Sequence, residues 1–246
     1  MADEYLFISD CHLQASRPDI SAALTEFLDM RAMRARCLYI LGDLFEVWLG
    51  DDDRPEEINP VIESLQRVAQ YCEVFFMVGN RDFLLGREFS EKIGMTLLNE
   101  PERIELGQQS LLLIHGDSLC SDDVDYQAFR KMVREPKWQN EFLAKPLQQR
   151  HQIAAQLRRD SAAAMVTKAV EIMDVNQQAV AQCFQDYDVD SIIHGHTHRP
   201  AIHRYANDLT RYVLGDWNPG PSVLSWNETA GFELEDARVK PVQAAR

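Results

Sequence analysis

Short apolar runs rich in strand-forming residues recur along the chain and predict β-strands. Helix-like segments at 21–36 and 58–71 separate the first three runs, a spacing that predicts strands joined by crossover helices. Only short turns separate the later runs, which predicts a second sheet of mixed or antiparallel pairing. The expected fold is α/β, with a two-sheet β-sandwich core flanked by helices. The runs are residues 5–9, 37–41, 74–78, 111–114, 191–193, 212–214 and 222–226.

Residues 121–186 depart from this pattern. They contain no convincing strand and predict helices, interrupted at Pro136 and Pro146. We therefore expect a core made of residues 1–120 and 187–246, with 121–186 inserted between two core strands as a helical cap.

The composition of the chain indicates one large globular domain that carries an insertion, since 46% of its 246 residues are hydrophobic and 26% are charged. No apolar stretch approaches the roughly 18 residues that a membrane-spanning helix needs, and Asp3 and Glu4 stand where a secretory signal would be basic. We therefore expect a cytoplasmic protein. The five cysteines are widely spaced without a CxxC pair, which predicts free thiols.

The formal net charge of -14 disfavours a nucleic-acid partner, because such binding depends on lysine and arginine contacts to phosphates. The charge is unevenly distributed, however. Between Tyr126 and Lys168, nine Lys and Arg residues stand against three Asp and Glu residues, a local charge of +6. This segment is either a contact for anions or an anionic membrane surface, or a solvated helix face.

Each of five apolar runs ends at polar residues of similar chemistry. Ligand sites of α/β sheets form beyond the carboxyl ends of the strands, where loops from several strands converge. The five strand ends therefore predict one common site. They carry Asp10 and His12, then Gly42 and Asp43, then Gly79 to Asp82, then His115 to Asp117, and finally His194 to His198.

Carboxylates, an amide and several imidazoles, without a thiolate, are ligands that suit Mn, Fe, Zn or Mg, and their number fits a site for two metal ions. Each short motif alone has a simpler explanation, because an aspartate after a strand can form a turn and a single histidine can be structural. All five in order are more specific. HGHTH is the most specific, since it places imidazoles on one side of an extended segment.

The series DCH, GD, GNR, HG and GHTH resembles the motifs of the calcineurin-like metallophosphoesterases. The resemblance spans residues 5 to 217 and implies a two-sheet sandwich with a dinuclear metal centre. It implies that Asp43 bridges the two cations and that His194 is a supporting residue. The remaining implied ligands are Asp10, His12 and His198 for one cation, and Asn80, His115 and His196 for the other.

One motif departs from that family, which has GNH where this chain has GNR. Together with GDLFEVWLGDD, HGDSLCSDD and EIMDVN, it is similar to the pyrophosphohydrolases that act on UDP-2,3-diacylglucosamine in lipid A biosynthesis. The narrower resemblance implies two Mn²⁺ ions and a metal-bound hydroxide that cleaves the pyrophosphate to UMP and 2,3-diacylglucosamine 1-phosphate. It implies catalytic roles for Arg81, Asn80 and His115. It adds Asp123 as a head-group contact. The full set of substrate contacts that we expect is Asn80, Arg81, Asp123, Ser161, Met165, Lys168 and His196.

Arg81 fits this chemistry by a separate argument. The usual histidine can protonate an alkoxide leaving group, whereas arginine cannot, because its pKa exceeds ~12. A sugar 1-phosphate leaves as an anion and needs charge stabilisation instead, which a guanidinium supplies by holding phosphate oxygens. The alternative is that Arg81 only forms a salt bridge to Asp82 or Asp117. Asp82 itself is left without a role.

A substrate with two acyl chains needs an apolar surface beside the polar site. Ser161, Met165 and Lys168 fall on one face of a predicted apolar helix, which we expect to cap the metal site, although such helices usually pack in the core. We also expect a monomer attached peripherally to the cytoplasmic face of the inner membrane. The residues expected at that anionic surface are Arg130, Lys131, Arg134, Lys137, Trp138 and Phe142.

Two other functions are compatible with these motifs. The first is a general dinuclear-metal phosphodiesterase or phosphatase acting on soluble nucleotides, in which the insertion is merely structural. The second is a scaffold that keeps the fold without the chemistry. The complete set of ligand residues argues against a scaffold.

Overall fold

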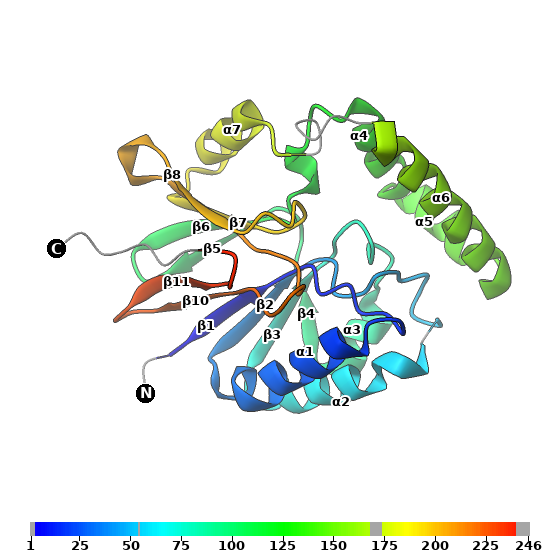
Figure 1. Ribbon diagram of the computed structural model, residues 1–246, viewed down its shortest axis with the longest axis horizontal. Helices are drawn as coiled ribbons and strands as arrows, with labels where there is room; N and C mark the ends of the chain where they lie inside the picture. Colours follow the sequence, from blue (N-terminus) through cyan, green and yellow to red (C-terminus); the bar gives the residue numbers. More distant parts are fainter. Residues whose placement is uncertain (1–2, 54, 168–173, 240–246) are drawn as a thin grey trace.

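The computed structural model describes residues 3–53, 55–167 and 174–239, without the side chains of 162–167. Over these residues, two mixed β-sheets form, with helices on their outer faces (Figure 1). The predicted α/β sandwich is therefore confirmed. None of the helices in the described ranges combines the length and apolarity needed to traverse a bilayer.

The first sheet has the strand order β11-β10-β1-β2-β3-β4. Strands β1 to β4 are parallel, whereas β10 and β11 are antiparallel to their neighbours. The parallel strands are connected through helices, as the spacing of the first three apolar runs predicts. The strands are β1 (Tyr5–Ile8), β2 (Cys37–Leu41), β3 (Glu73–Met77), β4 (Met95–Leu97), β10 (Val223–Asn227) and β11 (Gly231–Glu235).

The last apolar run, expected in the second sheet, forms β10 in the first, so that prediction was wrong. β10 pairs with the side of β1 that β2 leaves open, with Tyr5 opposite Trp226 and their rings 5.4 Å apart. Pairing there satisfies backbone groups that an edge strand would expose. Length and apolarity of a run do not indicate which sheet the run joins.

The second sheet has the order β5-β6-β7-β9-β8 and mixed pairing, as expected. β6, β7 and β9 are parallel, and β5 and β8 pair antiparallel at the edges. The edge strand β5 was missed because its sequence, ERIEL, alternates charged with apolar residues and lacks an apolar run. The strands are β5 (Glu102–Leu106), β6 (Gln109–Leu113), β7 (Ser191–His194), β8 (Ala201–Arg204) and β9 (Thr210–Val213).

Alternation along the strands divides their side chains between two faces. Phe7 of β1 belongs to the cluster between the sheets, with Leu111 and Ile193 of the second sheet. Leu6 and Ile8 belong to the cluster formed with the helices. The helices beside the first sheet are α1 (Pro18–Met30), α2 (Asn59–Val68) and α3 (Arg87–Ile93), and short 3-10 turns are η1 (Ala32–Arg34), η2 (Glu56–Ile58), η3 (Asp117–Leu119) and η4 (Ala206–Asp208).

The described part of the predicted insertion is helical. Figure 1 shows α4, α5 and α6 beyond the ends of β1, β2 and β3, whereas α7 lies over the second sheet. Phe184 of α7 packs in one cluster with Leu112 and Ile192 of that sheet. The helices are α4 (Val124–Val133), α5 (Pro136–Leu143), α6 (Leu147–Thr167) and α7 (Gln177–Tyr187).

Candidate metal centre

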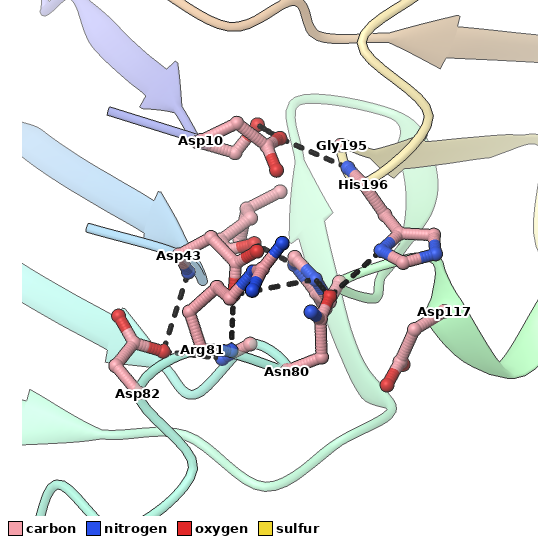
Figure 2. A network of polar contacts seen from close by, with 12 residues as sticks. Asp10, Asp43, Asn80, Arg81, Asp82, Asp117, Gly195 and His196 are labelled. Carbon is pink, nitrogen blue, oxygen red and sulfur yellow. Dashed lines mark hydrogen bonds and ion pairs between the residues drawn. The ribbon is translucent and has the colours of Figure 1, made fainter. Parts of the chain in front are cut away.

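Polar side chains from both sheets converge beyond the carboxyl ends of the strands, as Figure 2 shows for Asp10, Asp43, Asn80 and His196. The parallel strands β1, β2 and β3 end at one edge of their sheet, and β6 and β7 end facing it. Several of these residues have a left-handed backbone, which is uncommon for residues other than glycine and accumulates at functional sites. The φ angles are 53° at Asp10, 49° at His12, 53° at Asp43, 66° at His196 and 53° at His198.

Asp10, His12 and His198 form the first group of possible ligands. The His198 Nε2 atom lies 3.2 Å from Asp10 Oδ1 and 3.1 Å from His12 Nε2. Asp10 Oδ2 accepts hydrogen bonds from Ser9 Oγ at 2.6 Å and from the His196 backbone N–H at 2.9 Å. Asp10 Oδ1 is buried without a hydrogen-bond partner. A buried carboxylate oxygen requires such a partner, so a cation held by these residues fits the site.

Asn80, His115 and His196 form the second group. The side-chain oxygen of Asn80 lies 3.0 Å from His115 Nε2 and 2.8 Å from His196 Nδ1. The other ring nitrogen of His115, Nδ1, is 2.9 Å from the Leu41 carbonyl oxygen. That nitrogen therefore donates to the carbonyl, which leaves the lone pair of Nε2 directed at the site.

Asp43 lies between the two groups. Its Oδ2 is 3.8 Å from His12 Nε2, and its Oδ1 is 3.7 Å from His115 Nε2. A carboxylate in this position can be shared by two cations. Gly79 permits this approach, because a Cβ atom there would lie 2.1 Å from Asp43 Oδ1.

The electrostatics of the cluster favour cations. Burial alone lowers the pKa of His12, but Asp10, Glu46 and Asp43 outweigh burial and raise that pKa to about 10. Burial likewise lowers the pKa of His115, yet Asp43 and other carboxylates raise it to about 9. The His12 and His115 imidazoles therefore keep their protons to a higher pH, because several carboxylates surround them. Divalent metals bind to such groups by displacing protons, and oxygen with imidazole ligands suits Mn, Fe, Zn or Mg.

Asp82, which the sequence left without a role, anchors the loops that carry the ligands. Its fully buried carboxylate accepts hydrogen bonds from the backbone N–H groups of Gly79 at 2.7 Å, Leu44 at 2.8 Å and Asp43 at 3.3 Å. The loops after β2 and β3 are therefore fixed to each other (Figure 2). Burial and the neighbouring Asp43 raise the pKa of Asp82 to about 6.

His194 supports the loop rather than joining either group, in agreement with the sequence. Arg211 donates a hydrogen bond of 2.9 Å to His194 Nε2. Since arginine cannot accept a hydrogen bond, Nε2 carries no proton, and Nδ1 must donate to the Gly195 carbonyl 2.9 Å away. Arg211, 3% exposed, was missed because its strand sequence, TRYV, shows no motif.

The alternative ion pairs suggested for Arg81 do not form. The Asp82 carboxylate accepts backbone hydrogen bonds, and Asp117 pairs with Arg130 at 2.8 Å. Arg81 instead lies 3.8 Å from Glu46, and its Nε atom is buried without a hydrogen-bond partner. The Arg81 side chain is nevertheless 36% exposed, so its guanidinium is partly accessible from the site.

Two residues of the expected membrane surface face inward instead. Arg130 of α4 donates to Asp117 at 2.8 Å and to Glu100 at 2.7 Å. Arg134 donates to the Gly79 carbonyl at 2.9 Å. Buried carboxylates and a loop carbonyl bind these two arginines, so the expected membrane contact stays a prediction that rests on the other residues of the set. Phe142 is also buried.

The remaining predicted contacts belong to the segment 121–186. Asp123 is the N-cap of α4, where it accepts a hydrogen bond from the Tyr126 N–H at 3.1 Å. Ser161 is exposed on α6. Met165 belongs to α6, but its side chain is outside the described part, and Lys168 lies outside the described residues.

Tyr126 is a further residue that no motif indicated. Its ring stacks on His196 with the centroids 6.0 Å apart, and its hydroxyl donates to Asp117 at 2.8 Å.

Glu46 was also missed, although it follows Asp43 closely. Its Oε2 atom lies 2.9 Å from His12 Nδ1. The signal that could have identified Glu46 was its position close in sequence to the predicted ligand Asp43.

Comparison with known proteins agrees with this geometry. The sequence model of the calcineurin-like phosphoesterases matches residues 4–200, so the chain belongs to that family. The UDP-2,3-diacylglucosamine hydrolase of Klebsiella pneumoniae subsp. pneumoniae is 47% identical over 224 residues, covering 89% of this chain and 93% of the relative. The Coxiella burnetii protein of that name is 42% identical over 237 residues, covering 95% and 98%. Within the family, the chain groups with the UDP-2,3-diacylglucosamine hydrolases, as the narrower resemblance indicated.

Among solved structures, an archaeal phosphodiesterase aligns with a TM-score of 0.50 and 13% sequence identity, covering 94% of this chain and 98% of that protein. At this identity the likeness concerns the fold alone. It agrees with the calcineurin-like architecture.

Asp82→Asn is expected to loosen the ligand loops. In the wild type, backbone N–H groups donate to both carboxylate oxygens of Asp82, and the amide nitrogen of asparagine cannot accept such a hydrogen bond. Losing hydrogen bonds to a charged group should lower the free energy of unfolding by about 1.5–3 kcal/mol. Bound metal per chain should fall as well. Denaturant unfolding and elemental analysis measure both, with Asp19→Asn on the exposed surface of α1 as the control. Wild-type stability and metal content in Asp82→Asn would contradict the anchoring role.

Proposed function

We propose that this protein hydrolyses the pyrophosphate of UDP-2,3-diacylglucosamine to UMP and 2,3-diacylglucosamine 1-phosphate. The observation that carries the proposal is the assembly of two ligand groups around Asp43, next to the partly exposed guanidinium of Arg81. The names of relatives that match over most of the chain supply the substrate.

The ligand assignment is part of the proposal. Asp10, His12 and His198 would hold one divalent cation, and Asp43 would bridge to the other. Asn80, His115 and His196 would complete the second site. Bound there, the cations would lower the pKa of water and neutralise phosphate oxygens. Mn²⁺ is the proposed metal, because the narrower sequence resemblance implies it.

The residues of this chain would act mainly by binding and orienting the pyrophosphate. The guanidinium of Arg81 would hold phosphate oxygens while negative charge moves to the leaving sugar 1-phosphate. Asn80 and His196 would contact the same phosphates, and His115 would keep its Nε2 directed at the site through its bond to the Leu41 carbonyl. A proton donor for the leaving group is unnecessary, because a phosphate departs as an anion.

The cap would bind the lipid half of the substrate. Asp123, Ser161 and Lys168 would contact the sugar and its phosphate, and Met165 would contribute to the apolar surface for the acyl chains. Aromatic side chains lie where the cap meets the core, with the Phe83 and Trp138 rings 6.1 Å apart. This apolar junction supports placing acyl chains there.

Turnover in heavy-oxygen water tests the substrate and the position of attack together. We expect UMP and 2,3-diacylglucosamine 1-phosphate as products, with the heavy oxygen in UMP if attack occurs at the uridine-side phosphorus. Mass spectrometry of both products measures this outcome. Turnover of a soluble aryl phosphodiester without turnover of the lipid substrate would instead identify a general phosphodiesterase.

Arg81→His tests the charge-stabilisation argument. Histidine cannot hold two phosphate oxygens in the way a guanidinium can, so kcat should fall by about 10²-fold or more, the scale found when one stabilising donor is removed. Steady-state kinetics with the lipid substrate measure the loss, and bound metal serves as the control. Unchanged pyrophosphate hydrolysis would contradict the assigned role.

Membrane attachment is proposed on a narrower surface than the sequence suggested. Lys131 and Lys137 line a hollow between α4 and α5 together with Met132 and Trp138. Glu135 and Glu141 also line it, and Glu141 lies 4.0 Å from Lys137, so the attraction to an anionic surface is weak. Each lysine contributes about 1 kcal/mol at an anionic surface. We further propose that the protein is located at the cytoplasmic face of the inner membrane. We also propose that it is a monomer, and size-exclusion chromatography with light scattering tests its molar mass.

Co-sedimentation with anionic vesicles should therefore decrease at high salt and in the Lys131→Gln, Lys137→Gln variant, because both changes weaken the attraction. Neutral vesicles are the control. Binding that is insensitive to salt and to these substitutions would overturn the proposal.

A further inference from the structure

Glu46, in the loop after β2, contacts residues from three parts of the protein. Its Oε2 atom lies 2.9 Å from His12 Nδ1. Its Oε1 atom lies 3.1 Å from the Arg158 guanidinium and 3.8 Å from that of Arg81. Arg158 also donates to the Glu46 backbone carbonyl. One carboxylate therefore joins a proposed metal ligand, the proposed phosphate-binding arginine and the cap helix α6.

The contact with His12 determines which ring nitrogen can bind a metal. His12 Nε2 faces the carboxylates of Asp10 and Asp43, each 3.8 Å away. A ligating Nε2 must offer a lone pair, so the ring proton must sit on Nδ1. Glu46 accepts the hydrogen bond from Nδ1. A carboxylate in this position orients the ring and increases the basicity of the ligating nitrogen.

The contact with Arg158 extends this arrangement to the cap. Arg158 precedes Ser161 by three residues on α6, so the two share a helix face. The Glu46 side chain is only 22% exposed, which distinguishes it from a solvated surface partner. Because Arg158 binds both the carboxylate and the backbone carbonyl of Glu46, it restricts the position of the whole residue.

We propose that Glu46 is a positioning residue that couples the docking of the cap helix, through Arg158, to metal binding at His12. This inference rests on the proposed metal centre and deepens it. Glu46 is held from the cap side by Arg158 and holds His12 on the other side. Substitution of Arg158 should therefore lower the metal affinity only through its effect on the position of Glu46.

Metal titration of the full-length protein tests the coupling. After chelator treatment, Mn²⁺ alone is titrated by calorimetry into wild type, Glu46→Ala, Arg158→Met and the double variant. Removing a carboxylate that orients a ligating histidine typically costs 10–100-fold in metal affinity. We expect a loss of about 10–100-fold at one Mn²⁺ site in Glu46→Ala and a smaller loss in Arg158→Met. The double variant should be no weaker than Glu46→Ala.

The exposed pair Arg87 and Glu91 on α3, 2.6 Å apart, provides the matched control. Arg87→Met and Glu91→Ala should bind Mn²⁺ within about twofold of wild type, since exposed pairs contribute little. If Glu46→Ala does not fold, Glu46→Gln replaces it, because glutamine keeps the shape and one neutral acceptor. Glu46→Gln should show an intermediate loss.

Wild-type Mn²⁺ affinity in Glu46→Ala or Glu46→Gln would overturn the positioning role. Additive losses in the double variant would overturn the coupling through Glu46. Hydrolysis assays on the wild type separate this inference from the proposed substrate. Coupled metal binding without hydrolysis of UDP-2,3-diacylglucosamine refutes only the substrate, whereas hydrolysis without coupling refutes only the role of Glu46.

Discussion

Repulsion among buried carboxylates is the constraint on which this structure depends. Among the described residues, Asp10, Asp43, Asp82 and Asp117 are all buried near the strand ends. Asp82 is stabilised by backbone N–H groups and Asp117 by Arg130. Asp10 and Asp43 have neighbouring imidazoles but no guanidinium within ion-pair distance among the described residues. The protons that His12 and His115 hold offset this charge, and divalent cations would take over that role by displacing them.

The same constraint explains why an acidic protein carries a basic insertion. Arg130, Arg134 and Arg158 extend from the cap helices toward Glu100, Asp117 and Glu46, or toward carbonyls of the ligand loops. The cap is thus held on the core by ion pairs with the groups that surround the metal centre.

The sequence predicted that these polar residues lie together because each follows an apolar strand, and the rule that strand ends converge is general. It could not predict the partners of the arginines, since a charge on a helix does not indicate which residue it meets. Arg130 and Arg134 were assigned to a membrane for that reason. Glu46, Tyr126 and Arg211 were missed because their roles depend on contacts across long sequence separations. The sheet assignment of β10 failed likewise, because strand pairing is not encoded in a single run.

The balance of charge also implies an order of binding. A pyrophosphate brings negative charge to a place where Asp10 and Asp43 are already crowded, and the protons on His12 and His115 only offset those two carboxylates. Without divalent cations, the approach of phosphate oxygens to these carboxylates would be repulsive, and burial would strengthen the repulsion. Metal binding should therefore precede substrate binding. The partly exposed guanidinium of Arg81 then completes a surface that attracts anions only after the carboxylates have been neutralised.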